Sequence, residues 1–124
     1  MFSVLSVALW LTLAGQVADI PPTTAKDFYG QGMVRLRTQL YGDARESFQK
    51  AIAMQPAYPE AHQGLGETLI GIGLHEKAVA AFSKAIELKP DYAEAYAHRG
   101  RACFNIGREM SRSEERRVGK ECRL

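Results

Sequence analysis

Hydrophobic residues recur along the middle of the chain at intervals of three and four. In the segment 75–88 they are Ala78, Val79, Phe82, Ala85, Ile86 and Leu88. In the segment before it they are Ala61, Leu65, Leu69 and Ile72. This spacing places the apolar side chains on one face of an α-helix. The pattern therefore predicts two amphipathic helices, 59–72 and 75–88.

Proline and glycine mark the ends of these helices. Pro59 stands in the first turn of the first helix, where its missing N–H costs nothing, Gly73 ends that helix, and Pro90 follows the second. The same signals predict helices at about 25–38 and 42–54, and one from 93 to about 106 that Gly107 ends. Thr24 followed by Asp27 is typical of a helix start.

The chain repeats itself with a period of 34 residues. A shift of 34 lays residues 43–66 over 77–100, and ten of these 24 pairs are identical. The identical pairs are Ala44/Ala78, Phe48/Phe82, Lys50/Lys84, Ala51/Ala85, Ile52/Ile86, Pro56/Pro90, Tyr58/Tyr92, Glu60/Glu94, Ala61/Ala95 and Gly66/Gly100. A period of this length is typical of stacked supersecondary units. We predict an all-α stack of helical hairpins, with units 25–58 and 59–92 and a third, truncated unit 93–111. Gly66 and Ala78 are small where we expect the two helices of a hairpin to cross.

These residues resemble the tetratricopeptide-repeat (TPR) family. The residues that fit its 34-residue pattern are Phe28, Gly32, Ala44, Phe48, Ala51, Pro56, Leu65, Gly66, Ala78, Phe82, Ala85, Pro90, Tyr96 and Gly100. The departures are Gln31, Arg35, His62, Leu69, Arg99 and Cys103. The resemblance covers about 25–110 and implies a right-handed solenoid of antiparallel helix pairs, about two and a half repeats long.

The resemblance also implies a binding face, lined by the first helix of each repeat on the concave side. Carried over by position, these residues are Lys26, Tyr29, Met33, Leu36, Arg37, Glu60, Gln63, Glu67, Ile70, Gly71, Glu94, Ala97, Arg101, Phe104 and Asn105. We take as the candidate peptide-binding face Tyr29, Met33, Leu36, Arg37, Gln63, Glu67, Ile70, Arg101, Phe104 and Asn105. Exposed aromatic and Met residues are common anchors of recognition.

The expected function is therefore that of a non-enzymatic scaffold, which binds a peptide or partner protein through this face. The alternative is the N-terminal recognition module of a longer enzyme or secretion-machinery component. Some members of the family clamp the C-terminal carboxylates of chaperones with Lys and Asn. Here the candidates Lys26, Arg101 and Asn105 are scattered, and Glu60 and Glu67 would repel such a ligand, so we predict no chaperone clamp.

Composition and charge exclude several other classes. Outside residues 112–124 the basic and acidic side chains balance, 11 against 11, and no Lys/Arg stripe with interleaved aromatics occurs, so we expect no nucleic-acid partner. His62, His75 and His98 fall in different helices or a turn, and we expect no metal, cofactor or catalytic residue. We interpret Cys103 as a buried thiol.

The N-terminal residues 2–14 are apolar apart from two serines and one threonine, and the run is too short to span a bilayer. We interpret 1–18 as a signal peptide, cleaved after Ala14 or Ala18, and 19–24 as a linker. The alternatives are an N-terminal helix that packs on the repeats and an uncleaved anchor that extends to Ile20. A signal peptide or an anchor predicts an exported protein, periplasmic or secreted, with membrane contact only through an uncleaved N-terminal segment.

Residues 112–124 depart from the repeat. Arg112 and Arg116 stand where the pattern asks for alanine and an aromatic residue. The run RSEERRVGKECR, 112–123, looks like the literal translation of a widely used short-read sequencing adapter. We therefore predict that 112–124 are not native and that the natural protein continues differently after residue 111.

Overall fold

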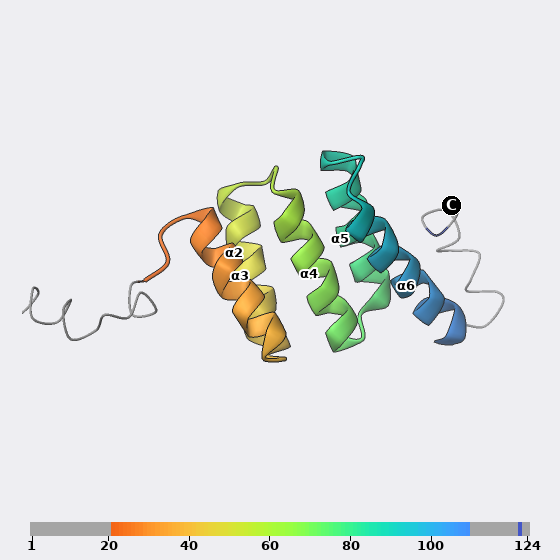
Figure 1. Ribbon diagram of the computed structural model, residues 1–124. Helices are drawn as coiled ribbons and strands as arrows, with labels where there is room; N and C mark the ends of the chain where they lie inside the picture. The colour runs from red at the N-terminus through yellow and green to blue at the C-terminus, as the bar shows by residue number, and fades with distance from the viewer. Residues whose placement is uncertain (1–20, 110–121, 123–124) are drawn as a thin grey trace, which may run out of the picture.

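The computed structural model describes residues 21–109 and 122, and the helices in this part of the chain form a single stack. They are α2 (Ala25–Arg37), α3 (Tyr41–Met54), α4 (Pro59–Ile72), α5 (His75–Leu88) and α6 (Ala93–Glu109). Figure 1 shows α2, α4 and α6 on the near side of the stack, with α3 and α5 behind them. The described residues contain no strand, and the all-α prediction is confirmed.

Each helix packs mainly on its neighbours along the chain. The extensive interfaces are α2 with α3, α3 with α4, α4 with α5 and α5 with α6. The contacts of α2 with α4 and of α4 with α6 are much smaller. The hydrophobic core is therefore a continuous seam between successive hairpins, as expected of repeats that bury their apolar faces only against one another.

Two phenylalanines form the centre of this seam, and glycines make room for them. Phe48 and Phe82 are fully buried. A Cβ at Gly32 would lie 2.8 Å from the ring of Phe48, and a Cβ at Gly64 would lie 2.6 Å from it. A Cβ at Gly66 would lie 2.6 Å from the ring of Phe82. These helical glycines allow the close approach of aromatic rings, which confirms the packing role predicted for Gly66.

The start of α2 is capped as the sequence predicts. Thr24 Oγ1 accepts a hydrogen bond from the backbone N–H of Asp27 at 3.1 Å, and the Asp27 carboxylate accepts one from the N–H of Thr24 at 3.0 Å. The bonds from Thr24 and Thr23 hold the pKa of Asp27 below its usual value, because they favour the carboxylate. The reciprocal pair satisfies N–H groups that the first turn leaves without helical partners.

The turns after α2 and α4 share one geometry but use different residues. Gly73 has φ 93° and Gln39, 34 positions earlier, has φ 61°. In both turns the following leucine donates its N–H back into the helix, from Leu74 to Leu69 O at 2.8 Å and from Leu40 to Arg35 O at 2.9 Å. Glycine adopts this left-handed conformation freely, whereas glutamine does so at a cost.

Two predictions about α6 are wrong. Gly107 does not end the helix, which continues to Glu109. Glycine permits a left-handed turn but does not impose it, and Gly107 keeps a negative φ. Cys103 is not a free thiol, because it forms a disulfide with Cys122. That partner belongs to the segment 112–124, which the sequence analysis predicts to be non-native.

Several predicted segments lie outside the described residues. These are the signal or anchor 1–18, the first two residues of the linker, and residues 112–121 and 123–124 of the tail. Among the described residues, no helix is both long and apolar enough to cross a membrane.

Candidate functional site

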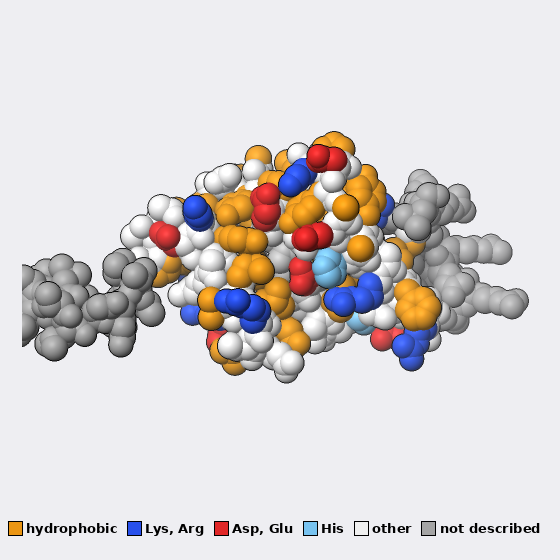
Figure 2. Space-filling view, in the orientation of Figure 1, with side chains coloured by type: hydrophobic (Ala, Val, Ile, Leu, Met, Phe, Trp, Pro, Cys, Tyr) orange, Lys and Arg blue, Asp and Glu red, His pale blue; other side chains and the backbone are white. Residues whose placement is uncertain are grey.

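An open hollow of about 510 Å³ lies on the side of the stack formed by α2, α4 and α6. Its lining residues are Met33, Leu36, Arg37, Gln39, Tyr41, Glu67, Ile70, Gly71 and Arg101. They come from α2, the turn after it, the start of α3, α4 and α6. In Figure 2 hydrophobic side chains gather over the middle of this side, with charged side chains and a histidine beside them.

The apolar part of the hollow depends on a missing side chain. Met33 and Leu36 project from α2 and Ile70 from α4, and all three are only partly buried. A Cβ at Gly71 would overlap the ring of Tyr41. The absence of that Cβ lets Tyr41, from the first turn of α3, lie against α4. The apolar part of the hollow is thus formed at the seam between two repeats.

Two guanidinium groups border the hollow without ion-pair partners among the described residues, whereas the carboxylate beside them is bonded to its neighbours. Arg37 and Arg101 are exposed, and neither forms an ion pair with a carboxylate of the described residues. Glu67 is engaged: its Oε1 accepts a hydrogen bond from Gln63 Nε2 at 2.8 Å and lies 3.6 Å from His98 Nε2. The hollow therefore presents two available cationic donors to a ligand.

A chain of hydrogen bonds runs along this side from one hairpin to the next. The hydroxyl of Tyr92 donates to Gln63 Oε1, and Gln63 in turn donates to Glu67. Burial raises the pKa of Tyr92 above its usual value, which further favours the protonated hydroxyl that donates to Gln63. His98 lies beside Glu67 and stacks on Phe82, with ring centroids 5.7 Å apart and an interplanar angle of 14°. The network connects the edge of the hollow to the core.

The structure brings together six of the ten residues predicted for the peptide-binding face. Those that line the hollow are Met33, Leu36, Arg37, Glu67, Ile70 and Arg101. Tyr29 packs against Tyr58 at 5.2 Å and Phe48 at 6.0 Å, and Gln63 is only 6% exposed. Neither of them lines the hollow, although Gln63 bonds to Glu67, which does. Phe104 is 66% exposed on α6 but does not line the hollow, and Asn105 lines a different one with Arg108 and Glu109.

Sequence reasoning missed Gln39 and Tyr41. The resemblance assigned the face to the first helix of each repeat, whereas Gln39 lies in the turn and Tyr41 in the second helix. One signal was present in the sequence: Gly71 occupies a lining position without a side chain, which leaves room for a neighbour to approach. The sequence does not say which neighbour.

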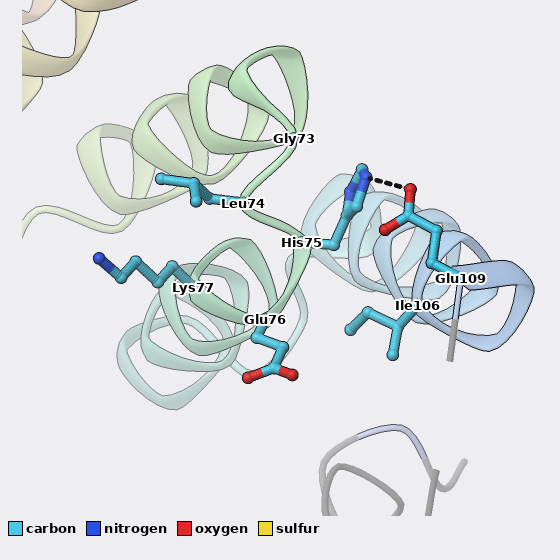
Figure 3. Close-up of a pocket in the computed structure, with 7 residues that line it drawn as sticks. All are labelled: Gly73, Leu74, His75, Glu76, Lys77, Ile106 and Glu109. Carbon is cyan, nitrogen blue, oxygen red and sulfur yellow. Dashed lines mark ion pairs between the residues drawn. The ribbon is translucent and has the colours of Figure 1, made fainter. Parts of the chain in front are cut away.

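A second hollow, of about 290 Å³, lies where the α4–α5 turn meets the end of α6. In Figure 3 the side chains of His75 and Glu109 point toward one another, and His75 Nε2 lies 3.5 Å from Glu109 Oε1. The Nδ1 atom of His75 is buried without a hydrogen-bond partner among the described residues. Within the same part of the chain no three His, Cys, Asp or Glu side chains come close enough to hold a metal ion.

Comparisons with known proteins agree on one fold. A family model described as "Tetratricopeptide repeat" matches residues 29–93 and 72–109. The solved structure of MamA is 30% identical with a TM-score of 0.66, over 81% of this chain and 57% of the MamA chain. This chain therefore spans little more than half of that relative. No curated protein matches the chain.

Two less similar structures show the fold alone. The second TPR of Spaghetti (RPAP3), solved with the HSP90 peptide SRMEEVD, is 22% identical with a TM-score of 0.67, over 81% of this chain and 90% of that one. The Sgt2 TPR domain from Aspergillus fumigatus is 22% identical with a TM-score of 0.66, over 85% of this chain and 70% of that one.

Proposed function

Because the chain belongs to the tetratricopeptide-repeat family, whose repeats form protein–protein interaction modules, we propose that it binds a peptide segment of a partner protein in the hollow between α2 and α4. One observation carries this proposal: the hollow combines an apolar floor with two guanidinium groups that have no ion-pair partner among the described residues. The proposed role is that of a scaffold, without catalysis.

The chemistry of the hollow defines the ligand it suits. Met33, Leu36 and Ile70 fit one aliphatic or aromatic side chain, and complete burial of such a side chain contributes about 1.5–3 kcal/mol. Arg37 and Arg101 can donate hydrogen bonds to backbone carbonyls or to a carboxylate of the peptide. The bonded state of Glu67 and Gln63 fixes this edge of the hollow before the ligand arrives, which lowers the entropic cost of binding.

A random peptide library panned against the full chain tests the proposal. We expect the enriched peptides to share one large apolar residue, and we expect Leu36→Glu to weaken their binding at least about tenfold, since a buried carboxylate opposes an apolar anchor. Val34→Glu is the matched control. It places the same charge on the same helix at a residue that is 51% exposed and does not line the hollow.

Equal binding by wild type and Leu36→Glu, with unchanged helicity, would move the site elsewhere. Arg101→Glu is a second variant that leaves the core intact, because this side chain is exposed. The SRMEEVD peptide bound in the RPAP3 structure is a further probe. We predict that it does not bind here, because Lys26, Arg101 and Asn105, the candidates for a carboxylate clamp, do not line one hollow.

The alternative role, a recognition module within a longer enzyme or secretion-machinery component, uses the same hollow and differs only in what is attached to it. Resequencing the gene across codon 111 separates the two roles and also tests the prediction that residues 112–124 are not native. Export is a separate proposal. Fusion of residues 1–24 to a phosphatase that is active only outside the cytoplasm should give activity if it holds.

A further inference from the structure

Charged side chains are unevenly distributed on the side of the stack formed by α2, α4 and α6. These three helices run in the same direction, so their first turns lie at one edge of this side (Figure 1). Glu60 lies in the first turn of α4 and Glu94 in the first turn of α6. Arg37 lies in the last turn of α2, and it lines the hollow together with Arg101. In Figure 2 red side chains lie above the hydrophobic middle of this side and blue side chains lie below it, with further blue ones at the upper rim.

The two acids at the first-turn edge are available to a ligand. Glu60 is half-buried and Glu94 is exposed. Neither side chain forms a hydrogen bond or an ion pair with another described residue. Lys26, in the first turn of α2, is exposed and forms an ion pair with neither of them. Glu60 and Glu94 can therefore each accept hydrogen bonds from a cationic group of a ligand.

Two tyrosine hydroxyls lie close to these acids. Burial raises the pKa of Tyr29 and of Tyr92, and the negative charges of neighbouring carboxylates raise both values further. Glu60 and Glu94 act on both hydroxyls. Because such charges are screened over about 10 Å in water, acids from α4 and α6 must lie near both tyrosines. We call these four residues, Tyr29, Glu60, Tyr92 and Glu94, the acidic edge, and they come from three successive repeats.

One aromatic ring of the acidic edge already holds a cation. Lys89 Nζ lies 4.7 Å from the centroid of the Tyr92 ring. The ring of Tyr29 packs against Tyr58 with 5.2 Å between centroids, and it is only half-buried. Aromatic faces attract ammonium and guanidinium groups. The acidic edge therefore suits a lysine or arginine side chain of a ligand.

Helix geometry gives the distance from the acidic edge to the apolar floor of the hollow. Glu60 and Ile70 are ten residues apart on α4, which corresponds to about 15 Å along the helix. An extended peptide covers this distance in about five residues. Arg37 and Arg101 line the hollow together with Ile70, so an acidic residue of the ligand would neighbour its apolar one.

We propose that the peptide in the hollow carries its charges in a fixed order, a proposal that rests on the proposed function. A lysine or arginine binds at the acidic edge, and an apolar residue about five positions away binds in the hollow. An acidic residue beside the apolar one pairs with Arg37 and Arg101. The ligand is thus a peptide with separated basic and acidic residues, and its charge order determines which way it lies across the helices.

Three synthetic peptides with blocked termini test the charge order against the full chain by fluorescence anisotropy. The ordered peptide is Lys-Ser-Gly-Ser-Ser-Leu-Asp, the exchanged peptide has its Lys and Asp interchanged, and the neutral peptide has serine at both positions. Each is made in both chain directions, because side-chain order does not fix the direction of the backbone. We expect the ordered peptide to bind at least about fivefold more tightly than the exchanged one at low salt. The difference should shrink in 1 M salt, where the Debye length is about 3 Å.

Variants of the protein locate the basic residue of the ligand. Glu94→Lys should weaken the ordered peptide about threefold or more and strengthen the exchanged one, because it replaces attraction by repulsion. Asp43→Lys is the matched control, since it also removes an exposed acid from the first turn of a helix, but of α3. Glu60→Gln is a milder second variant that keeps the size of the side chain. Arg101→Glu should shift the same preference from the other end of the ligand.

The outcomes separate this proposal from the proposed function. If no peptide of this set or of the random library binds, both are wrong. If all three peptides bind equally and Leu36→Glu weakens them all, the hollow binds peptides but the charge order is wrong. A preference for the ordered peptide that Glu94→Lys and Glu60→Gln leave unchanged would also overturn the proposal. In that case the two acids only stabilise the starts of their helices, and thermal unfolding of the variants would show that loss.

Discussion

The two complete hairpins fill the same three interior positions with opposite chemistry. In the hairpin of α4 and α5 they are Leu65, Leu69 and Ala81, and Leu69 and Ala81 are 5% and 8% exposed. In the hairpin of α2 and α3 the counterparts are Gln31, Arg35 and Ser47. Arg35 Nη1 donates to Ser47 Oγ at 2.6 Å and to the carbonyl of Asp43 at 3.3 Å.

The difference shows that the hairpin geometry does not require an apolar residue at every interior position. Phe48 in the first hairpin and Phe82 in the second are both fully buried, and each fixes the crossing of its two helices. Around Phe48, hydrogen bonds offset the cost of desolvating the polar side chains. Around Phe82, apolar side chains stabilise the hairpin through dispersion contacts. The polar hairpin needs all three of its interior side chains, because replacing one of them leaves another without its hydrogen bond.

The largest expected effect is in the apolar hairpin. We predict that Leu69→Ala lowers the free energy of unfolding by about 2–5 kcal/mol, because it leaves a cavity in a close-packed seam. Urea unfolding followed by circular dichroism measures the loss. Val34→Ala, at a residue that is 51% exposed, is the control and should change stability by less than about 0.5 kcal/mol. A loss below about 1 kcal/mol at Leu69 would contradict the comparison.

The polar hairpin should respond in two directions. We predict that Arg35→Leu alone lowers stability by about 1–3 kcal/mol, because buried Ser47 loses its donor. The triple change Gln31→Leu, Arg35→Leu and Ser47→Ala copies the apolar hairpin and should raise stability by about 1–3 kcal/mol relative to wild type. The same urea titration tests both. A triple variant less stable than Arg35→Leu would show that the first hairpin cannot pack the apolar side chains of the second.

The turns provide a smaller test of the same comparison. Gln39 and Gly73 occupy equivalent left-handed positions. We predict that Gln39→Gly raises the free energy of unfolding by about 1 kcal/mol, because glycine removes the steric cost of a positive φ. Gly73→Gln should lower it by a similar amount. Thermal unfolding should show stability changes of opposite sign for the two substitutions. Changes of the same sign would indicate that other contacts of these turns, rather than the backbone conformation, determine their stability.

The smallest effect concerns the start of the first hairpin and depends on pH. The pKa of Asp27 is lowered from 3.8 in the folded state, so its stabilising contribution is present above that pH and is lost as the pH falls through the folded pKa. We predict that Asp27→Asn lowers the melting temperature at pH 7 and that the difference from wild type shrinks as the pH falls below 3.8. Asp43→Asn, in the first turn of α3 where no side chain caps the helix, is the control.

Much of the fold could be predicted from the sequence because proline and glycine mark the ends of the helices within a repeat. The predicted bounds 59–72 and 75–88 are those of α4 and α5, since Pro59, Gly73 and Pro90 act locally. The end of α6 was wrong, because Gly107 only permits a turn. The cysteine interpretation was also wrong, because a disulfide depends on which distant residue comes close, and spacing along the chain does not encode that.

The candidate site could be predicted in part, for a related reason. Met33, Leu36 and Ile70 share a helix face, and helix periodicity places such residues reliably. Tyr41 reaches the hollow only because Gly71, on another helix, lacks a side chain. Gln63 was expected to be available to a ligand but is committed to Tyr92 and Glu67. Contacts of this kind depend on packing between repeats, which the pattern within one repeat does not contain.

The position of the hollow at a seam has a consequence for engineering and for evolution by duplication. A 34-residue repeat can be copied, deleted or exchanged as a module without breaking the stack. The hollow cannot be transferred in this way, because its lining comes from three successive repeats. Inserting a copy of residues 59–92 would reproduce Glu67, Ile70 and Gly71, but would place His75 rather than Tyr41 beside the second glycine. Transplanting recognition to another solenoid therefore requires grafting a junction of repeats rather than a repeat.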